Sequence, residues 1–249
     1  MQPTLSNPTA IATEVAPSRL RWFYPTMAAV AIAIVGLGFA PSFYLRALGT
    51  ENLSPSLRVL PGYFYVHGVI LTTWFLLFFA QTLLIASNRR EIHRRVGVAG
   101  AVVATAVVIM TLVVAVRAIK IPLSVSVLDM PVVFFFNVFG LIQFAVLVGC
   151  ALKFRRQPEV HKRLMYLANL PLLGAATSRL LLPFPFGGLI GPNAPLLWLL
   201  ALVALDFAVD GRLHRATLWG GIVFLVATIP IIAVIGFSDF GRMIVEALA

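Results

Sequence analysis

Charged residues are scarce in this sequence of 249 residues. Asp, Glu, Lys and Arg together make up 11% of the chain, whereas 60% of it is apolar. A soluble domain is about one quarter charged and about half apolar, so this much apolar surface cannot be hidden in one soluble core. The composition therefore excludes an ordinary soluble enzyme or binding domain and indicates a protein that lies in a lipid bilayer.

Cysteine and the short catalytic motifs are also nearly absent. The single cysteine, Cys150, lies in an apolar run and has no partner for an intramolecular disulfide. The sequence contains no His-x-x-x-His pair, no Gly-x-Ser-x-Gly elbow and no glycine-rich phosphate loop followed by Lys. Any chemistry must therefore come from isolated polar residues inside or beside the apolar segments.

Uninterrupted apolar runs predict the fold. In lipid, a helix satisfies its own backbone hydrogen bonds, and about 20 residues are enough to cross the bilayer. We therefore expect an all-α, polytopic transmembrane helix bundle over residues 23–249, preceded by a disordered cytoplasmic tail over residues 1–22. The seven predicted spans are 24–45, 62–87, 95–116, 131–153, 162–183, 195–210 and 216–237.

Basic residues give the predicted bundle a direction. Of the 19 Lys and Arg, 13 fall in the tail or in the turns at 88–95, 153–163 and 211–215, which overlap the ends of the neighbouring spans. Because cytoplasmic loops are enriched in basic residues, the amino terminus is expected in the cytoplasm and the carboxyl terminus outside. The net charge of +10 then indicates contact with anionic lipid headgroups rather than with nucleic acid. The 13 residues are Arg19, Arg21, Arg89, Arg90, Arg94, Arg95, Lys153, Arg155, Arg156, Lys162, Arg163, Arg212 and Arg215.

The four histidines lie near predicted span ends. His93, His161 and His214 lie at the cytoplasmic ends and are each followed by a basic residue, whereas His67 lies near the outer end of the second span. One interpretation makes the three cytoplasmic histidines headgroup anchors. The other makes them ligands of a metal ion or a haem iron, because neutral imidazole is the commonest protein metal ligand.

Two aspartates in the sixth span sharpen the ligand interpretation. Asp206, Asp210 and His214 recur every fourth residue, so an uninterrupted helix places them on one face. A similar stripe of His161, Met165 and Asn169 begins the fifth span and could face the stripe of the sixth span. The candidate ligands of a zinc-like ion are therefore His93, His161, His214, Asp206 and Asp210.

The alternative for the same aspartates is a structural cluster. Charges at membrane depth have to be paired, and Arg163, Arg212 and Arg215 are the nearby cations that could neutralise them. Gly211 is also a residue type at which a helix readily ends, which would break the stripe before His214.

A second polar stripe lies in the second span. His67, Trp74 and Gln81 are seven residues apart, which predicts one helix face that points into the bundle. Arg179, late in the fifth span, either reaches the outer headgroups or binds an anionic group such as a haem propionate or a lipid headgroup. The candidate cofactor-binding residues are therefore His93, His161, His214, His67 and Arg179.

Three motifs at cytoplasmic span ends carry a resemblance. They are His93-Arg94-Arg95-Val96-Gly97, His161-Lys162-Arg163-Leu164-Met165 and Asp210-Gly211-Arg212-Leu213-His214, with Trp74 and Gln81 in the second span. With them, the chain after residue 21 resembles an uncharacterised family of bacterial multi-pass inner-membrane proteins, which implies that fold and that location. It is also distantly similar to small b-type membrane cytochromes, in which histidines on neighbouring helices ligate haem. Because only one histidine lies on the outer side, this similarity implies one haem b on the cytoplasmic side.

Three functions are compatible with these features. The first is a b-type-cytochrome-like protein that takes part in membrane electron transfer. The second is a non-catalytic accessory or assembly subunit, with a membrane-protein partner or a second copy of the chain and no cofactor. The third is a metal-dependent lipid hydrolase with a three-histidine site, similar to the alkaline ceramidases and progestin-receptor-like hydrolases.

Overall fold

The computed structural model describes residues 20–48, 61–120, 130–228 and 235–249. Every regular element in these residues is helical, as predicted. Most of the predicted amino-terminal tail, residues 1–19, lies outside the described residues. Its last residues, Leu20–Trp22, form a short 3-10 turn that leads into the first long helix.

The first part of the chain consists of long apolar helices. These are α1 (Phe23–Phe39), which continues as a π-helical turn (Ala40–Tyr44), α2 (Gly62–Ala86), α3 (Arg90–Ala118) and α4 (Met130–Lys153). Together with Ile190–Asp210, five segments have the length and apolar composition needed to cross a membrane. The prediction of a multi-pass helical membrane protein is supported at this level.

The second part consists of shorter helices. They are α5 (Pro158–Leu167), α6 (Leu170–Leu181), α7 (Gly187–Asn193), α8 (Leu196–Asp210), α9 (Arg215–Thr228) and α11 (Asp239–Leu248). The predicted fifth span, 162–183, is thus not one continuous helix. Pro171 has no backbone N–H, and its ring would clash with the carbonyl of Leu167, so the helix ends there and restarts. Part of the predicted seventh span, 229–234, lies outside the described residues.

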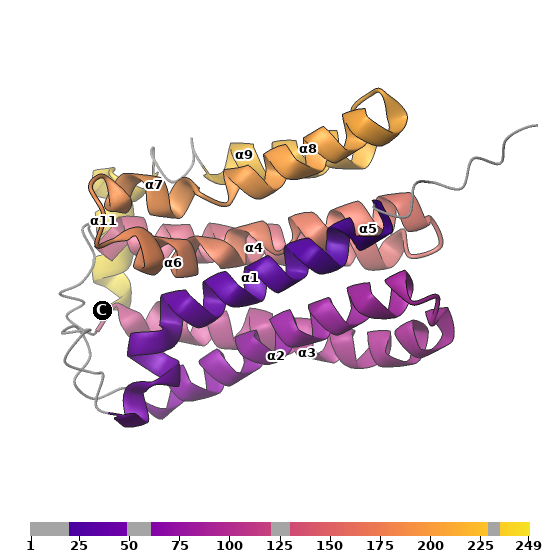
Figure 1. Ribbon diagram of the computed structural model, residues 1–249. Helices are drawn as coiled ribbons and strands as arrows, with labels where there is room; N and C mark the ends of the chain where they lie inside the picture. The colour runs from indigo at the N-terminus through magenta and orange to yellow at the C-terminus, as the bar shows by residue number, and fades with distance from the viewer. Residues whose placement is uncertain (1–19, 49–60, 121–129, 229–234) are drawn as a thin grey trace, which may run out of the picture.

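The helices run roughly along one axis (Figure 1). The start of α1 and the α2–α3, α4–α5 and α8–α9 turns lie at one end, and α11 lies at the other. We call the first end the basic end, because its turns carry exposed Lys and Arg. The exposed basic residues there include Arg21, Arg89, Arg94, Lys153, Arg155, Arg156, Arg212 and Arg215.

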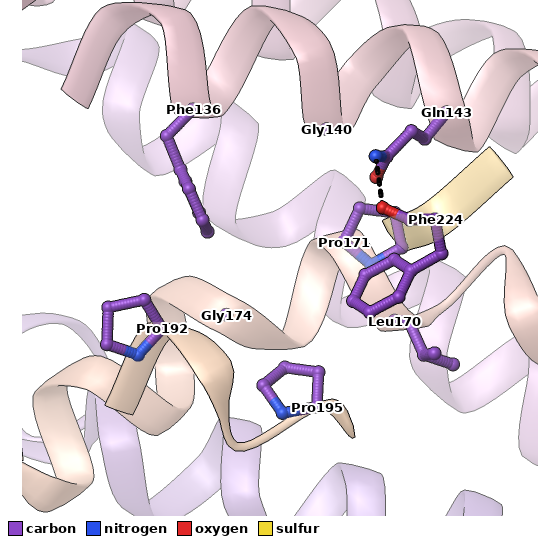
Figure 2. A pocket seen from close by; sticks show the side chains of 9 residues that line it. All are labelled: Phe136, Gly140, Gln143, Leu170, Pro171, Gly174, Pro192, Pro195 and Phe224. Atoms are coloured by element: carbon purple, nitrogen blue, oxygen red, sulfur yellow. Dashed lines mark hydrogen bonds between the residues drawn. The ribbon is translucent and has the colours of Figure 1, made fainter. Parts of the chain in front are cut away.

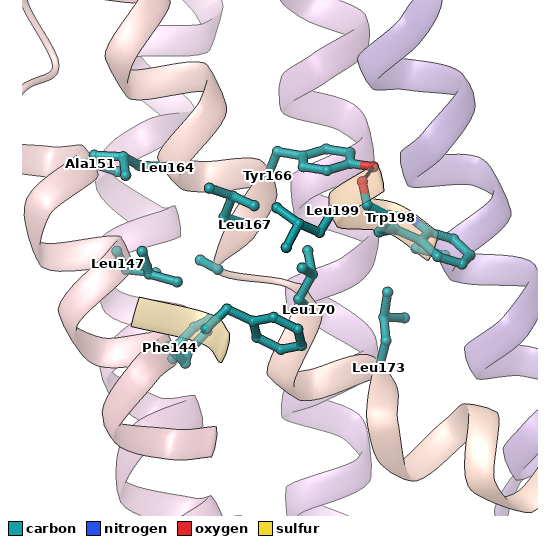
Figure 3. Close-up of a cluster of buried hydrophobic side chains, with 14 of the residues drawn as sticks. Phe144, Leu147, Ala151, Leu164, Tyr166, Leu167, Leu170, Leu173, Trp198 and Leu199 are labelled. Carbon is teal, nitrogen blue, oxygen red and sulfur yellow. Dashed lines mark hydrogen bonds between the residues drawn. The ribbon is translucent and has the colours of Figure 1, made fainter. Parts of the chain in front are cut away.

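The core lies where α4, α5, α6 and α8 meet (Figure 3). Phe144 and Leu147 of α4 pack there with Leu167 of α5 and with Leu170 and Leu173 of α6, and all of them are almost fully buried. By contrast, apolar side chains on the outer helix faces are exposed. Exposure of this extent is expected for a bundle whose outer surface faces lipid.

Candidate functional site

The structure brings two of the four histidines together. His93 in the first turn of α3 and His161 in the first turn of α5 have ring centroids 6.3 Å apart, with ring planes at 81°. Both helices begin at the basic end (Figure 1), which is why residues far apart in the sequence meet there. This pair is the strongest candidate for a ligand site among the described residues.

A backbone carbonyl fixes the His161 ring. Its Nδ1 lies 2.8 Å from the carbonyl oxygen of Ala151, near the end of α4. A carbonyl oxygen only accepts hydrogen bonds, so Nδ1 carries the proton in the neutral ring and Nε2 keeps a free lone pair. Histidines that bind metals are commonly oriented by a second hydrogen bond of this kind.

The side chain of Gln81 orients His93. The Gln81 amide oxygen accepts a hydrogen bond from the backbone N of Gly97 (2.9 Å). Its amide nitrogen donates to the backbone carbonyl oxygen (3.2 Å) and to Nδ1 (2.5 Å) of His93. In this arrangement, the neutral His93 ring carries its proton on Nε2. The contact connects α2 with α3 next to the histidine pair.

His214 lies in a different environment. Its backbone N donates to Asp206 Oδ2 (3.1 Å), and its Nδ1 accepts from the backbone N of Ala216 (3.0 Å), which caps the start of α9. Burial, and then the charge of Arg163, lower the pKa of His214 below its ordinary value. The ring is therefore a neutral acceptor that stabilises a helix start.

The proposed five-residue metal site finds no support. Across the described ranges, no three His, Cys, Asp or Glu side chains are grouped closely enough to hold one metal ion. The physical reason is at Gly211, which adopts a left-handed conformation (φ 63°) and ends α8 at Asp210. The stripe from Asp206 therefore does not continue to His214 as one helix face.

The two aspartates belong to a structural cluster around Arg163. Arg163 is 2% exposed and Asp206 is fully buried, and Arg163 Nε donates to Asp206 Oδ1 at 2.8 Å. Arg163 also contacts Asp210 Oδ2 (3.4 Å) and Glu159 Oε2 (2.5 Å). Of the three cations considered from the sequence, Arg163 is the partner that pairs with these carboxylates.

Glu159 forms the outer part of this cluster. Its carboxylate also pairs with Lys162, at 2.6 Å. Burial acts to raise the pKa of Glu159, but hydrogen bonds from Lys162 and Arg163 outweigh it and hold the pKa below its ordinary value. The cluster thus contains charges that largely compensate one another within the chain.

The predicted inward face of α2 is observed. Trp74 is 3% exposed, and its Nε1 donates to Asn169 Oδ1 at 2.9 Å. Asn169 lies at the α5–α6 break and also donates to the carbonyl oxygen of Met165 (2.8 Å). The asparagine that the sequence placed on a ligand stripe therefore stabilises the interrupted backbone instead.

His67 and Arg179 lie at the other end of the bundle. His67 is in the second turn of α2 and is partly buried, and Arg179 is in the last turn of α6. Both helix ends lie opposite the basic end in Figure 1. The five candidate cofactor-binding residues therefore fall into separate places: the His93–His161 pair, the His214 cap, and the end of the bundle where His67 and Arg179 lie.

A small cavity lies inside the bundle, away from all the predicted site residues (Figure 2). It has about 10 Å³ of space for the centre of a water molecule, which is about enough for one water. The side chain of Gln143 borders it and donates to the carbonyl oxygen of Phe224 at 3.0 Å. In the sequence, the only signal for this cavity is the amide residue Gln143 within a predicted span, together with several prolines in the segments that follow. The lining residues are Phe136, Gly140, Gln143, Leu170, Pro171, Gly174, Pro192, Pro195 and Phe224.

Comparison with known proteins gives no match: no protein-family model, curated protein or solved structure is similar to this chain. The function therefore has to be inferred from the geometry of its own residues.

Proposed function

We propose that this protein is a multi-pass protein of the bacterial inner membrane that holds one haem b between His93 and His161 and takes part in membrane electron transfer. The observation that carries the proposal is the pairing of these two imidazoles on neighbouring helices at one end of the bundle. His93 and His161 would hold the haem, which would supply one-electron redox chemistry when bound.

The spacing of the pair fits two ligands of one metal centre. Imidazole nitrogens bind metal ions at about 2.0–2.1 Å, so His93 and His161 would have to lie side by side to hold one such group. The observed separation is 6.3 Å. A direct hydrogen bond between the two rings would bring their centroids closer than this, so the rings do not bond each other directly.

The neighbouring residues orient both rings and favour ligation at Nε2 of His161. Ala151 holds the proton of His161 on Nδ1. For His93, the Gln81 amide holds the ring through Nδ1 and the backbone carbonyl oxygen, so ligation at Nε2 would require this amide to rotate out of the arrangement that also bonds Gly97. Ala151 and Gln81 are thus positioning residues for the two ligands.

The proposal includes an orientation in the membrane. With α1, α2, α3, α4, α5–α6, α8 and α9 each crossing the bilayer, the chain crosses it seven times. The exposed basic residues at the end where α1 begins favour the cytoplasm for that end. The haem then lies near the cytoplasmic surface, next to anionic headgroups, and no nucleic acid is involved.

The visible spectrum of the purified protein tests the haem. Protein expressed with added haem precursor and purified in detergent is expected to show a Soret band that shifts on reduction with dithionite. His93→Ala and His161→Ala should each lose the band, whereas His214→Ala, a matched histidine change at the same end, should keep it. A wild-type protein without the band, or a His161→Ala variant that keeps it unchanged, would contradict the proposal.

A second function is favoured by the Arg163 cluster. Its carboxylates are paired within the chain, which suits a stable scaffold with no chemistry of its own. In this alternative, the chain is an accessory or assembly subunit, with a membrane-protein partner or a second copy. A stable partner that copurifies in several detergents, together with a colourless protein, would favour it. The lipid-hydrolase alternative has no comparable support, because the described residues gather no group of three ligands.

A further inference from the structure

Two polar residues at the end opposite the basic end have no role in the proposed haem site. The Nδ1 atom of His67 is buried and has no hydrogen-bond partner among the described residues. A buried polar atom without a partner destabilises the fold, so such an atom usually marks a bound ligand or water. The second residue is Arg179, in the last turn of α6.

Among the described residues, Arg179 has little to compensate its charge. Its guanidinium donates to the carbonyl oxygen of Ala175 (3.1 Å) and lies over the ring of Phe39, with Cζ 4.6 Å from the ring centroid. No carboxylate in the described ranges forms an ion pair with it. The side chain is nevertheless exposed on the bundle surface, so a ligand from the membrane can reach it.

The π-helical turn of α1 connects the two residues. Phe39 directly precedes this turn and supports Arg179 of α6, while Phe43 within it packs on α2. Gly68, next to His67, leaves the space that the Phe43 ring occupies, because a Cβ at this position would overlap the ring. Tyr44 Oη also lies 2.7 Å from Thr72 Oγ1. Widened turns of this type are frequent at functional sites, and here the turn lies between α2 and α6, with Phe43 against Gly68 and Phe39 under Arg179.

The chemistry of this place suits a phosphate group. A guanidinium offers several N–H donors in a fork that matches phosphate oxygens, and an imidazole offers one more. The position also suits a lipid, because Arg179 lies in the last turn of α6, close to where a span reaches the headgroups. A free phosphate ion shares the chemistry but has no apolar tail to lie along the exposed helix faces.

We propose that Arg179 and His67, held together by the π-helical turn of α1, form a specific binding site for the phosphate of one anionic phospholipid in the outer leaflet. This site is separate from the haem site and does not depend on it. It differs from general headgroup contact because it needs the imidazole of α2 as well as the guanidinium of α6.

Native mass spectrometry of the full-length, delipidated protein tests the site. Short-chain phosphatidylglycerol is titrated into wild type, Arg179→Gln, His67→Gln and Arg117→Gln. Arg117→Gln is the control, since Arg117 is an exposed arginine in the last turn of α3. We expect one tightly bound lipid in the wild type and in Arg117→Gln. Arg179→Gln should weaken binding about 10-fold or more, the equivalent of one lost charge-assisted hydrogen bond.

Three results would overturn this inference. One is equal lipid binding by Arg179→Gln and Arg117→Gln, which would show general headgroup contact. Another is lipid binding by His67→Gln that equals that of the wild type. This variant also tests the site if Arg179→Gln does not fold. The last is a thermal-stability titration in which inorganic phosphate raises the melting temperature of the protein as much as the lipid does. That result would reassign the site to a free ion.

Discussion

Arg163 is the residue that most constrains the basic end of the molecule. Its guanidinium is buried and lies among the carboxylates of Asp206, Asp210 and Glu159. Removing two charges from water is expensive, and the cost is recovered only when hydrogen bonds satisfy both groups. The pair therefore fixes how α5 lies against α8, and it is a place where a single substitution has a large effect.

We predict that Asp206→Ala strongly destabilises the protein. Loss of this carboxylate leaves a buried guanidinium with weaker partners, which costs about 3–5 kcal/mol. Denaturant titration of the protein in mixed micelles measures the change. Asp239→Ala is the control, because Asp239 is fully exposed and its contact with Arg242 is 3.9 Å long. Equal stability of the two variants would show that the buried pair does not hold the helices together.

His214 predicts a pH dependence of stability. Burial and the charge of Arg163 lower its pKa, so below the ordinary value of 6.5 the unfolded chain takes up a proton before the folded protein does. Stability from this group is therefore complete above pH 6.5 and is lost as the pH falls through the lowered value.

The measurement compares wild type with His214→Asn, which can still cap α9 but does not titrate. Melting temperatures recorded from pH 7.5 to about pH 5 should fall more steeply for the wild type than for the variant. Parallel curves would mean that the ring is not held in its neutral form by the fold.

At the scale of helices, α1 and α6 approach closely at Gly38. A methyl group there would overlap the backbone carbonyl of Ala176. We predict that Gly38→Ala separates these helices and costs about 1–3 kcal/mol. Gly36→Ala is the matched control, since a Cβ at Gly36 meets no atom within 4 Å. The control should be neutral or more stable, and a Gly38→Ala variant as stable as the control would contradict the close contact.

Several helix features could be predicted from the sequence, and others could not. Apolar runs located α1 to α4 and α8 closely, because burial in lipid dictates both composition and length. The α5–α6 break was missed, although Pro171 signalled it, because the surrounding run stays apolar. α11 was missed for the opposite reason: it is amphipathic, with a short apolar face toward α4 that includes Val245.

The candidate site was predictable only as a set of residue types. The sequence indicated that histidines and aspartates gather at one end, and it named Arg163 as one possible partner. It gave no means to pair His93 with His161 rather than with His214, because that depends on how α3 and α5 pack. Whether α8 ends at Asp210 or continues to His214 depends on the backbone conformation of Gly211, and the sequence left both possibilities open.

For the whole molecule, the main consequence of the fold is that its two ends differ chemically. One end has the basic turns and the starts of α3 and α5, while the other has the start of α2, the end of α6 and α11 (Figure 1). The Arg163 cluster and the His93–His161 pair therefore lie at the first end, and His67 and Arg179 lie at the second. If these ends face opposite sides of a membrane, the proposed haem and the proposed lipid site belong to different leaflets. The orientation of the bundle is therefore the claim on which both proposals rest.

Cysteine labelling in spheroplasts tests this claim most directly. With Cys150 replaced by Ala, single cysteines are introduced as Gln157→Cys in the α4–α5 turn and as Arg242→Cys in α11, where both side chains are exposed. A membrane-impermeant maleimide should label Arg242→Cys in intact spheroplasts and Gln157→Cys only after lysis. Labelling of Gln157→Cys in intact spheroplasts, or of both positions from the same side, would contradict the account.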